Sequence, residues 1–332
     1  MKSYIILNVE KVMICEQSPA HKRCQRERNY DEKEHATVRG LFLSMGTSPG
    51  APVELLVLGK GWTGAYVVRA ANETGVSVAA TTRNGRDGTI AWEFAPESND
   101  PSRFNQLPNA RTVLVTFPVL SRDAMRRLTD FYETTRPAFE ASVRWILLGT
   151  TSNFNPPNPA ADPWCDRHTP LTNLAPRNEG EAQLLQYRSS SSTVIHLAGL
   201  YDAKERNPRN FVSRVAPTKQ ALLTKKSVHY IHGVDVARAI LAVHAMFERA
   251  VGQRWILCNI RVYDWWEFLG CAVPTGWDLK EEGDPEVWSW VLEACRETGV
   301  KGLPRNVTDL GRGMDGRDFW ETFGVLPRFS QL

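Results

Sequence analysis

The sequence predicts an α/β protein built on a doubly wound parallel sheet, with a small mixed, aromatic-rich region near the carboxyl end. Three observations predict this class. Short apolar runs alternate with segments of helical spacing from residue 53 to about residue 250, a Gly-x-Gly-x-x-Gly turn follows the first run, and tryptophans cluster late in the chain. Strands that alternate with helices are typical of a parallel sheet covered by helices on both faces.

Apolar patterns place the elements in order. Continuous apolar runs, typical of buried parallel strands, lie at 53–58, 76–82, 112–116, 143–148, 193–197 and 254–260. Helical spacing marks 61–73, 121–134 and 178–187, and a further helix carries Val236, Ile240, Val243 and Phe247 on one apolar face. Late aromatic residues are predicted to form the core of the small region: Trp265, Trp266, Trp277, Trp288 and Trp290.

Composition divides the 332 residues into three stretches. Residues 1–50 are predicted to be a poorly ordered extension, because 21–35 is dense in charge and 46–52 is small and turn-forming. Residues 51–250 form the predicted α/β domain. Residues 251–332 form a carboxyl-terminal region that we expect on the substrate side of that domain.

Charge and composition also exclude several classes of protein. A hydrophobic fraction of 42% with 23% charged residues excludes disordered, collagen-like and coiled-coil proteins. The net charge of +3 offers no field for holding nucleic acid or an anionic membrane, so neither is an expected partner. No apolar run approaches the roughly 20 residues of a membrane span, and the start of the chain lacks the apolar stretch of a secretory signal.

The six cysteines form no Cys-x-x-Cys pair, which indicates reduced thiols and predicts a cytoplasmic protein. No metal site is expected, because Asp162, Asp166 and His168 lack a recognisable ligand spacing.

The strongest motif is the turn Gly59-Lys60-Gly61-Trp62-Thr63-Gly64, between the first predicted strand and the first predicted helix. That position is what a dinucleotide site needs. The first glycine permits the tight turn, the second lets the backbone approach a pyrophosphate, and Gly64 lets the helix pack on the strand. The N–H groups at the start of the helix, at Trp62 and Thr63, then face the phosphates.

The end of the second strand predicts which dinucleotide binds. An acidic residue there would bind the ribose hydroxyls of NAD, but the sequence reads Thr81-Thr82-Arg83-Asn84-Gly85. Arg83 is suited to a 2′-phosphate through a charge-assisted pair. We therefore predict NADP, with NAD as the less favoured alternative.

Beyond these motifs, the chain resembles the extended short-chain dehydrogenase/reductase superfamily, in its NAD-dependent epimerase/dehydratase branch. The resemblance runs from about residue 53 to 250 and more weakly to the end. Its segments are GKGWTG, TTR, VLVTFPV, WILLGTTSNF, HTPLTNLAPRNEGEAQLL, VIHLAGLYDAKERNP and VHYIHGVDVARAI. The family implies a Rossmann fold with NAD(P) across the strand ends, and it places Thr116 and Pro118 beside the cofactor.

The family's catalytic unit is a Ser or Thr at a strand end, with Tyr and Lys separated by three residues. The resemblance places Thr150 at the hydroxyl position, with Thr151 as the alternative. Aligning Glu181 with the family's acidic helix residue puts Arg177 at the lysine and Asn173 at the tyrosine. A shift of one helical turn puts Arg177 at the tyrosine and Glu181 at the lysine. Neither register supplies a phenol.

Other side chains are candidates for the missing proton donor. Tyr201 lies near the nicotinamide in the family layout. Two His–Asp pairs are the other candidates: His168 with Asp166, and His232 with Asp235. Each of these histidines has a structural role as its alternative. Arg206 or Arg209 is a candidate for binding an anionic substrate group, with a solvated loop as the equal alternative.

Two functions remain open from the sequence. One is an NADP-dependent oxidoreductase or epimerase-like enzyme that acts on a small hydroxylated or carbonyl metabolite. The other is a non-catalytic NADP-binding sensor or regulatory protein of the same superfamily, which the absent Tyr and Lys favour. A homodimer is expected by analogy with the superfamily.

Overall fold

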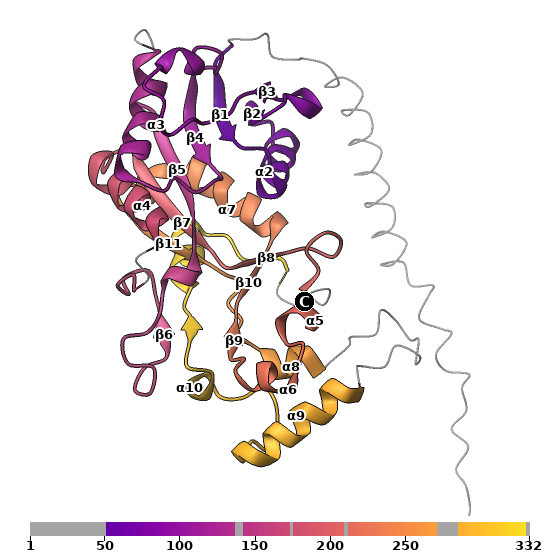
Figure 1. Cartoon of the computed structure of the whole chain (residues 1–332). Coiled ribbons are helices and arrows are strands. Elements are labelled where there is room, and N and C mark those ends of the chain that lie inside the picture. Colours follow the sequence, from indigo (N-terminus) through magenta and orange to yellow (C-terminus); the bar gives the residue numbers. More distant parts are fainter. Residues whose placement is uncertain (1–50, 137–141, 173–174, 209–211, 271–284, 330–332) are drawn as a thin grey trace, which may run out of the picture. The chain divides into compact units, whose positions relative to one another are not determined.

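The computed structural model describes residues 51–136, 142–172, 175–208, 212–270 and 285–329 (Figure 1). These residues belong to one compact unit that runs from Pro49 to Leu332. The extension predicted at residues 1–50 lies outside the described residues.

A seven-stranded sheet forms the centre of the fold, and each neighbouring pair of strands is parallel. The strands, in their order across the sheet, are β11 (Arg254–Leu257), β7 (Ser192–Leu197), β5 (Arg144–Thr150), β4 (Ala110–Val115), β1 (Val53–Leu58), β2 (Val78–Thr82) and β3 (Ile90–Ala91). The chain builds outward from β1 toward β3 and then returns to build from β4 toward β11. This order confirms the doubly wound α/β class and puts the switch in direction between β1 and β4, where such sheets bind ligands.

Helices cover both faces of this sheet (Figure 1). Alternate residues of β1 point to opposite faces. Leu55 and Val57 pack with α2 (Trp62–Glu73) and α7 (Gly233–Ala245) in one core. Leu56 and Leu58 pack with α3 (Arg122–Thr134) and α4 (Pro176–Tyr187) in the other. All four β1 side chains are fully buried, which explains why the strand reads as one apolar run.

A third, smaller core lies among α6 (Lys219–Leu223), α8 (Trp265–Gly270) and α9 (Pro285–Thr298). Trp266 is buried at its centre, with Trp265, Trp288 and Trp290 packed against it. The predicted aromatic core is therefore confirmed for these four residues, and Trp277 lies outside the described residues.

The remaining elements are short. They are β6 (Trp164–Cys165), β8 (Gly199–Tyr201), α5 (Val212–Val215), β9 (Ser227–Val228), β10 (Tyr230–His232), β12 (Tyr263–Asp264), α10 (Val307–Leu310), β13 (Gly313–Met314) and α11 (Arg317–Phe323). Sequence reading did not single out these elements or α9. Among the residues that the structure describes, no helix has the length and apolar character needed to cross a bilayer.

Elements on both sides of the boundary predicted between residues 250 and 251 pack with the part of the chain across it. β11, which follows it, is an edge strand of the main sheet, and α11 packs against the main core through Phe319 and Phe323. The small core, conversely, includes Ala216 and Leu222, which precede the boundary. The three-part division by residue number stays a prediction.

Candidate cofactor-binding and active site

The glycine turn lies at the carboxyl end of β1, and two of its glycines are required by the protein's own packing. Gly59 has a φ of 94°, a left-handed conformation that favours glycine, and a Cβ there would lie 2.6 Å from the Thr116 hydroxyl. At Gly64 a Cβ would lie 2.6 Å from the Gly59 carbonyl oxygen. These contacts account for the tight turn and for the close packing of α2 on β1.

Gly61 differs from both. A Cβ at this position would meet no atom within 4 Å, so nothing in the described protein requires a glycine there. Gly61 is also the residue before α2, and no side chain caps the start of this helix. The first N–H groups of a helix have no partner within it. The turn thus presents bare backbone and unpaired donors, as a bound phosphate would need.

Neighbouring strands hold the turn in place. The Gly59 N–H donates to the Thr81 hydroxyl at 2.9 Å, and the Lys60 N–H donates to the Thr81 carbonyl at 2.7 Å. On the other side the Thr116 hydroxyl donates to the Gly59 carbonyl at 2.7 Å. In this structure, therefore, Thr116 supports the glycine turn from β4 and does not stand free beside it.

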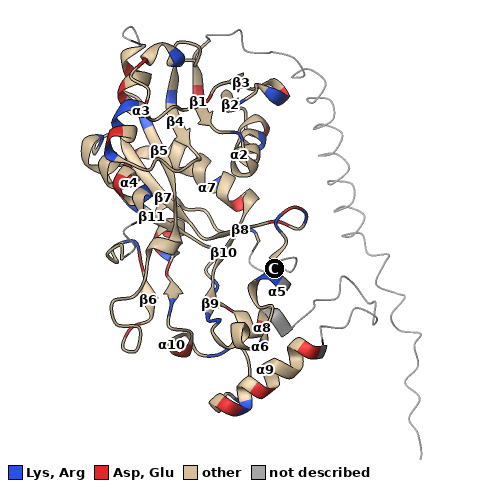
Figure 2. Cartoon of the chain, in the orientation of Figure 1, with Lys and Arg blue, Asp and Glu red and all other residues tan. Residues whose placement is uncertain are grey.

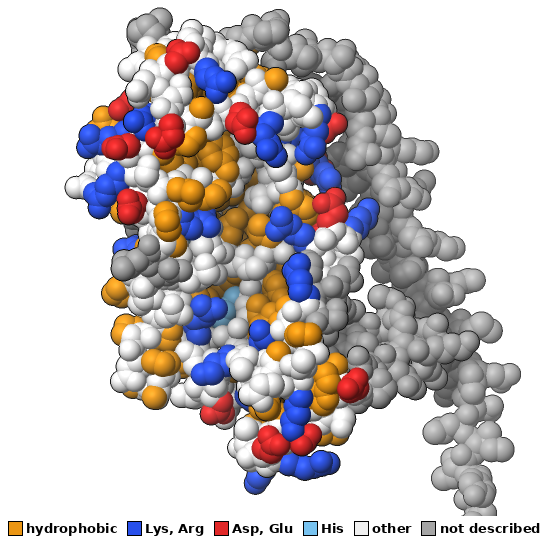
Figure 3. All heavy atoms as spheres, in the orientation of Figure 1, with side chains coloured by type: hydrophobic (Ala, Val, Ile, Leu, Met, Phe, Trp, Pro, Cys, Tyr) orange, Lys and Arg blue, Asp and Glu red, His pale blue; other side chains and the backbone are white. Residues whose placement is uncertain are grey.

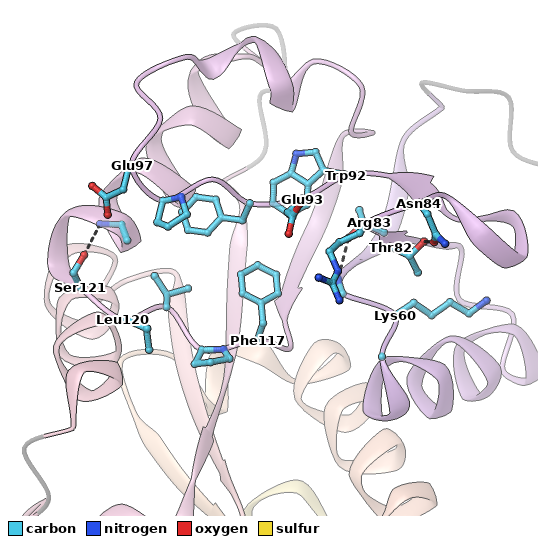
Figure 4. Close-up of a pocket in the computed structure, with 18 of the residues that line it drawn as sticks. Lys60, Thr82, Arg83, Asn84, Trp92, Glu93, Glu97, Phe117, Leu120 and Ser121 are labelled. Carbon is cyan, nitrogen blue, oxygen red and sulfur yellow. Dashed lines mark hydrogen bonds between the residues drawn. The ribbon is translucent and has the colours of Figure 1, made fainter. Parts of the chain in front are cut away.

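A cavity of about 830 Å³ opens beside the turn, between the ends of β2 and β4 (Figure 4). Gly59 and Gly61 line it together with Arg83, Pro118 and Leu120. Lys60 and Arg83 lie on one side of the cavity, across from Leu120 and Ser121 (Figure 4). In the space-filling view apolar side chains gather in this upper half of the molecule, with basic side chains beside them (Figure 3).

Arg83 is well placed for an anionic group. It lies at the end of β2, it is exposed, and it has no hydrogen bond or ion pair with another described residue. Lys60, on the same side, donates through Nζ only to the Asp87 carbonyl at 3.3 Å. Two cations therefore flank the cavity where the ribose end of a dinucleotide would lie.

Sequence reading missed the aromatic wall of the cavity. Trp92, Phe94 and Phe117 stack in a row, with ring centroids 6.3 Å and 6.2 Å apart. Glu93 and Glu97 also line the cavity. The only available signal was the aromatic-rich stretch after β3, which no short motif marks.

The candidate hydroxyls lie at the end of β5. Thr150 is half-buried, and its hydroxyl lies 3.1 Å from that of Ser152 and accepts from the Ser152 N–H at 3.3 Å. Thr151 is buried, and its hydroxyl donates to the Leu197 carbonyl at 3.4 Å. Of the two, Thr150 has the more accessible hydroxyl.

A buried polar cluster lies behind Thr150. The Glu181 carboxylate is 4% exposed and contacts Arg177 Nε at 3.4 Å and His196 Nδ1 at 3.7 Å. His196 Nδ1 also lies 3.3 Å from the Thr150 carbonyl oxygen. A Cβ at Gly149 would come within 2.9 Å of Glu181 and 2.6 Å of His196, so this glycine makes room for the cluster.

Burial shifts the pKa values of Glu181 and His196 in this cluster. Burial raises the pKa of Glu181 to about 7, and the positive charge of Arg177 offsets only part of that rise. Burial, with the nearby charge of Arg254, lowers the pKa of His196 to about 3. His196 is therefore neutral near pH 7, and its contact with Glu181 is no ion pair. Arg177 donates to the Leu148 carbonyl at 3.3 Å.

Tyr201 and the last described residues form a second cluster at the start of α7. The buried Asp235 carboxylate accepts from the backbone N–H groups of Arg328 and Phe329, both at 2.9 Å. The Phe329 ring stacks on His232 with 3.9 Å between centroids. The Tyr201 hydroxyl donates to the Phe329 carbonyl at 3.0 Å, and burial raises the pKa of this phenol above its ordinary value.

The other histidine candidates have structural partners. Asp166 accepts from the backbone N–H of His168, and no described bond joins its carboxylate to the imidazole. His232 Nδ1 accepts from the Val234 N–H and so caps α7. Asn173 and Arg209 lie outside the described residues. Within the described ranges no group of three or more His, Cys, Asp or Glu side chains is placed to hold a metal ion.

No model of a known protein family matches the chain, and no curated protein matches it. Solved structures do match. Yeast methylglyoxal/isovaleraldehyde reductase complexed with NADPH gives a TM-score of 0.54 at 13% identity, over 83% of this chain and 94% of that chain. UDP-N-acetylglucosamine 4-epimerase from Bacillus cereus gives 0.52 at 14% identity, over 83% and 94%. The chain has the short-chain dehydrogenase/reductase fold.

A third match has the same character. A short-chain dehydrogenase/reductase superfamily protein from Agrobacterium tumefaciens, with bound NAD, gives a TM-score of 0.53 at 14% identity, over 83% of this chain and 93% of that chain. These likenesses confirm the predicted NAD-dependent epimerase/dehydratase type of fold. The roles of individual site residues in the short-chain dehydrogenase/reductase fold of this chain stay predictions.

Proposed function

We propose that the protein is an NADP-dependent oxidoreductase or epimerase-like enzyme that acts on a small hydroxylated or carbonyl metabolite. The observation that carries the proposal is the bare backbone at Gly61, beside an uncapped helix start and a cavity of about 830 Å³. At the start of α2, this glycine leaves the backbone open to a phosphate, because no described side chain occupies the space. The solved relatives include proteins whose structures hold NADPH or NAD.

Arg83 supports NADP over NAD. Its guanidinium is free of protein partners within the described residues and stands at the cavity side that follows β2. A 2′-phosphate would satisfy it with charge-assisted bonds, and such bonds contribute about 1.5–3 kcal/mol. The carboxylates that line the cavity, Glu93 and Glu97, follow β3 and not β2.

The chain's own residues would then divide the work of binding and orientation. The Thr150 hydroxyl, at the end of β5, would orient a substrate carbonyl or alcohol. Arg177 would hold the ribose or the substrate through its remaining N–H donors. The nicotinamide, when bound, would supply or accept the hydride. The proton donor is unassigned.

A non-catalytic NADP-binding sensor is the second candidate. It is favoured by the lack of a phenol at the tyrosine position in either register of the resemblance, and by the bond that the Tyr201 hydroxyl donates to the Phe329 carbonyl. A small-molecule substrate belongs to the first candidate alone. The cytoplasmic location and the homodimer stay predictions under both.

Binding measurements test the cofactor site. We expect Gly61→Ala to weaken NADPH binding at least about tenfold, because a methyl group occupies the approach of a phosphate. Folding should be unchanged, since this methyl meets no protein atom. Gly302→Ala is the matched control, because it too meets no atom within 4 Å and its residue is not part of the cavity. Equal NADPH affinity in wild type and G61A would overturn the proposed site.

Turnover separates enzyme from sensor. NADPH is mixed with a panel of aldehydes and ketones, and the nicotinamide absorbance is followed. We expect oxidation by wild type, a loss of about 10²-fold or more in Thr150→Ala, and recovery in Thr150→Ser, which keeps the hydroxyl. Turnover unaffected by T150A would remove Thr150 from the site. Tight NADPH binding without turnover on any substrate would favour the sensor.

A further inference from the structure

The loop after β8, residues 202–208, is attached to the glycine turn by a buried carboxylate. Asp202 Oδ2 accepts from the Trp62 indole N–H at 3.1 Å and from the Tyr66 hydroxyl at 2.9 Å. Both partners lie in the first turns of α2. The start of α2 and this loop, far apart in sequence, are therefore held side by side, as Figure 1 also shows.

The same carboxylate shapes the loop. Asp202 Oδ1 accepts from the N–H groups of Lys204 and Arg206, at 3.0 Å and 2.8 Å. The Asp202 N–H in turn donates to the Arg206 carbonyl at 3.3 Å. Burial acts to raise the pKa of Asp202, but the hydrogen bonds from Arg206, Tyr66 and Trp62 outweigh it and hold the pKa below its ordinary value. An ionised Asp202 thus fixes the backbone position from which the Arg206 side chain extends.

The Arg206 side chain stacks on Trp62, the residue that follows Gly61. Its guanidinium carbon lies 4.7 Å from the centroid of the Trp62 ring. Trp62 is the first residue of α2, so the guanidinium stacks on the side chain of the residue at which this helix begins. In the charge-coloured ribbon the loop after β8 includes basic residues (Figure 2).

Arg206 is a cation without an anionic partner among the residues that the structure describes. It is exposed, and within the described ranges it forms no ion pair. Stacking on the indole uses the face of the guanidinium, so the N–H groups at its edge stay available for oxygen acceptors. A planar cation held in this way is suited to a phosphate, which it can bind through two parallel bonds.

The position of Arg206 indicates which anionic group of a bound cofactor or substrate it would contact. Arg83, at the proposed 2′-phosphate subsite, follows β2 and lines the cavity, whereas Arg206 follows β8 and is not among the residues that line it. The cofactor's pyrophosphate lies over the glycine turn itself. A substrate anion would lie farther along, toward Thr150.

We propose that Arg206 is a cofactor-binding residue that closes over the pyrophosphate from the loop after β8, with Asp202 as the residue that positions it. The inference rests on the proposed NADP function and adds a residue to its site. It replaces the expectation that Arg206 binds a substrate anion. Because both NADPH and NADH carry the pyrophosphate, Arg206 serves either dinucleotide equally, in contrast to Arg83.

The test compares dissociation constants of NADPH and NADH for the full-length protein. We expect Arg206→Ala to weaken both dinucleotides by the same factor, about 10- to 150-fold, which is what charge-assisted hydrogen bonds contribute. Arg206→Lys, which keeps the charge, should recover part of the loss. Arg83→Ala should weaken NADPH alone. Lys204→Ala, in the same loop, is the matched control and should leave both constants unchanged.

Asp202→Asn gives a second readout. It removes the charge that receives two loop N–H groups, so it should weaken both dinucleotides in the same ratio as R206A but by less. Wild-type affinity for both dinucleotides in R206A would overturn the inference and leave the proposed function standing, and so would a loss of NADPH alone. Failure of the wild-type protein to bind either dinucleotide would instead overturn the proposed function and this inference with it.

Discussion

Replacing Glu181 by glutamine should make the protein more stable at alkaline pH. Glutamine has nearly the same shape as a protonated glutamic acid and carries no charge. Glu181 is 4% exposed, its oxygens have no hydrogen-bond partner within the described residues, and burial raises its pKa from 4.5 to about 7. Ionisation of this carboxylate therefore lowers the stability of the folded state, despite the contact with Arg177 at 3.4 Å.

The sign and size follow from the two pKa values. Between pH 4.5 and about 7 the folded protein binds a proton at Glu181 more tightly than the unfolded chain does. This group's contribution to stability therefore falls as the pH rises through that window and is constant above it. At about 1.4 kcal/mol for each pKa unit, the full effect is about 3 kcal/mol as an upper limit.

Urea denaturation followed by circular dichroism measures this effect. We expect E181Q to exceed wild type in free energy of unfolding by about 2–3 kcal/mol at about pH 8, and to equal it within about 1 kcal/mol at about pH 5. Glu179→Gln, on the same helix but exposed, is the control and should stay within about 0.5 kcal/mol of wild type at both. A variant less stable than wild type at about pH 8 would refute the reasoning, because the Arg177 pairing would then outweigh burial.

Three further substitutions have defined outcomes. Gly64→Ala should lower the free energy of unfolding by about 1–3 kcal/mol, because its methyl group meets the Gly59 carbonyl at 2.6 Å, and a melting temperature equal to that of wild type would contradict this. Arg136→Met should cost at least about 3 kcal/mol in urea denaturation, since Arg136 donates to several buried backbone carbonyls; a smaller loss would show that water replaces it. Tyr201→Phe should lower the free energy of unfolding by about 1 kcal/mol in urea denaturation, for the lost bond to the Phe329 carbonyl. A separate NADPH titration of this variant should give the wild-type affinity.

Local signals predicted the sheet and the glycine turn. Parallel strands are buried on both faces, so β1, β4 and β5 read as apolar runs, and the structure places them within two residues of the expected bounds. The turn combines a positive φ at Gly59 with a close approach at Gly64, and both requirements are visible as glycines at fixed spacing. Strand ends were less certain: the strand expected to reach Ile260 ends at Leu257, and Ile260 has a φ of 62°.

The clusters behind the site could not be predicted, because they join residues from different helices and strands that meet only in the folded chain. Glu181 on α4 meets His196 on β7 only after both pack beneath Thr150. Trp62 and Asp202 are separated by 140 positions, so no spacing rule relates them. The one local signal of the Glu181–His196 cluster was Gly149. In the sequence this glycine indicates only the end of a strand, whereas in the structure its missing side chain leaves space for two polar groups.

The return of the chain to Asp235 affects how the protein should be handled in the laboratory. A purification tag joined after Leu332 would extend the segment whose N–H groups at Arg328 and Phe329 donate to that carboxylate. Proteolytic trimming of the same few residues would leave a negative charge facing His232 with fewer donors. Tags are better attached at the amino end, and samples should be checked by mass spectrometry for loss of carboxyl-terminal residues before any binding experiment is interpreted.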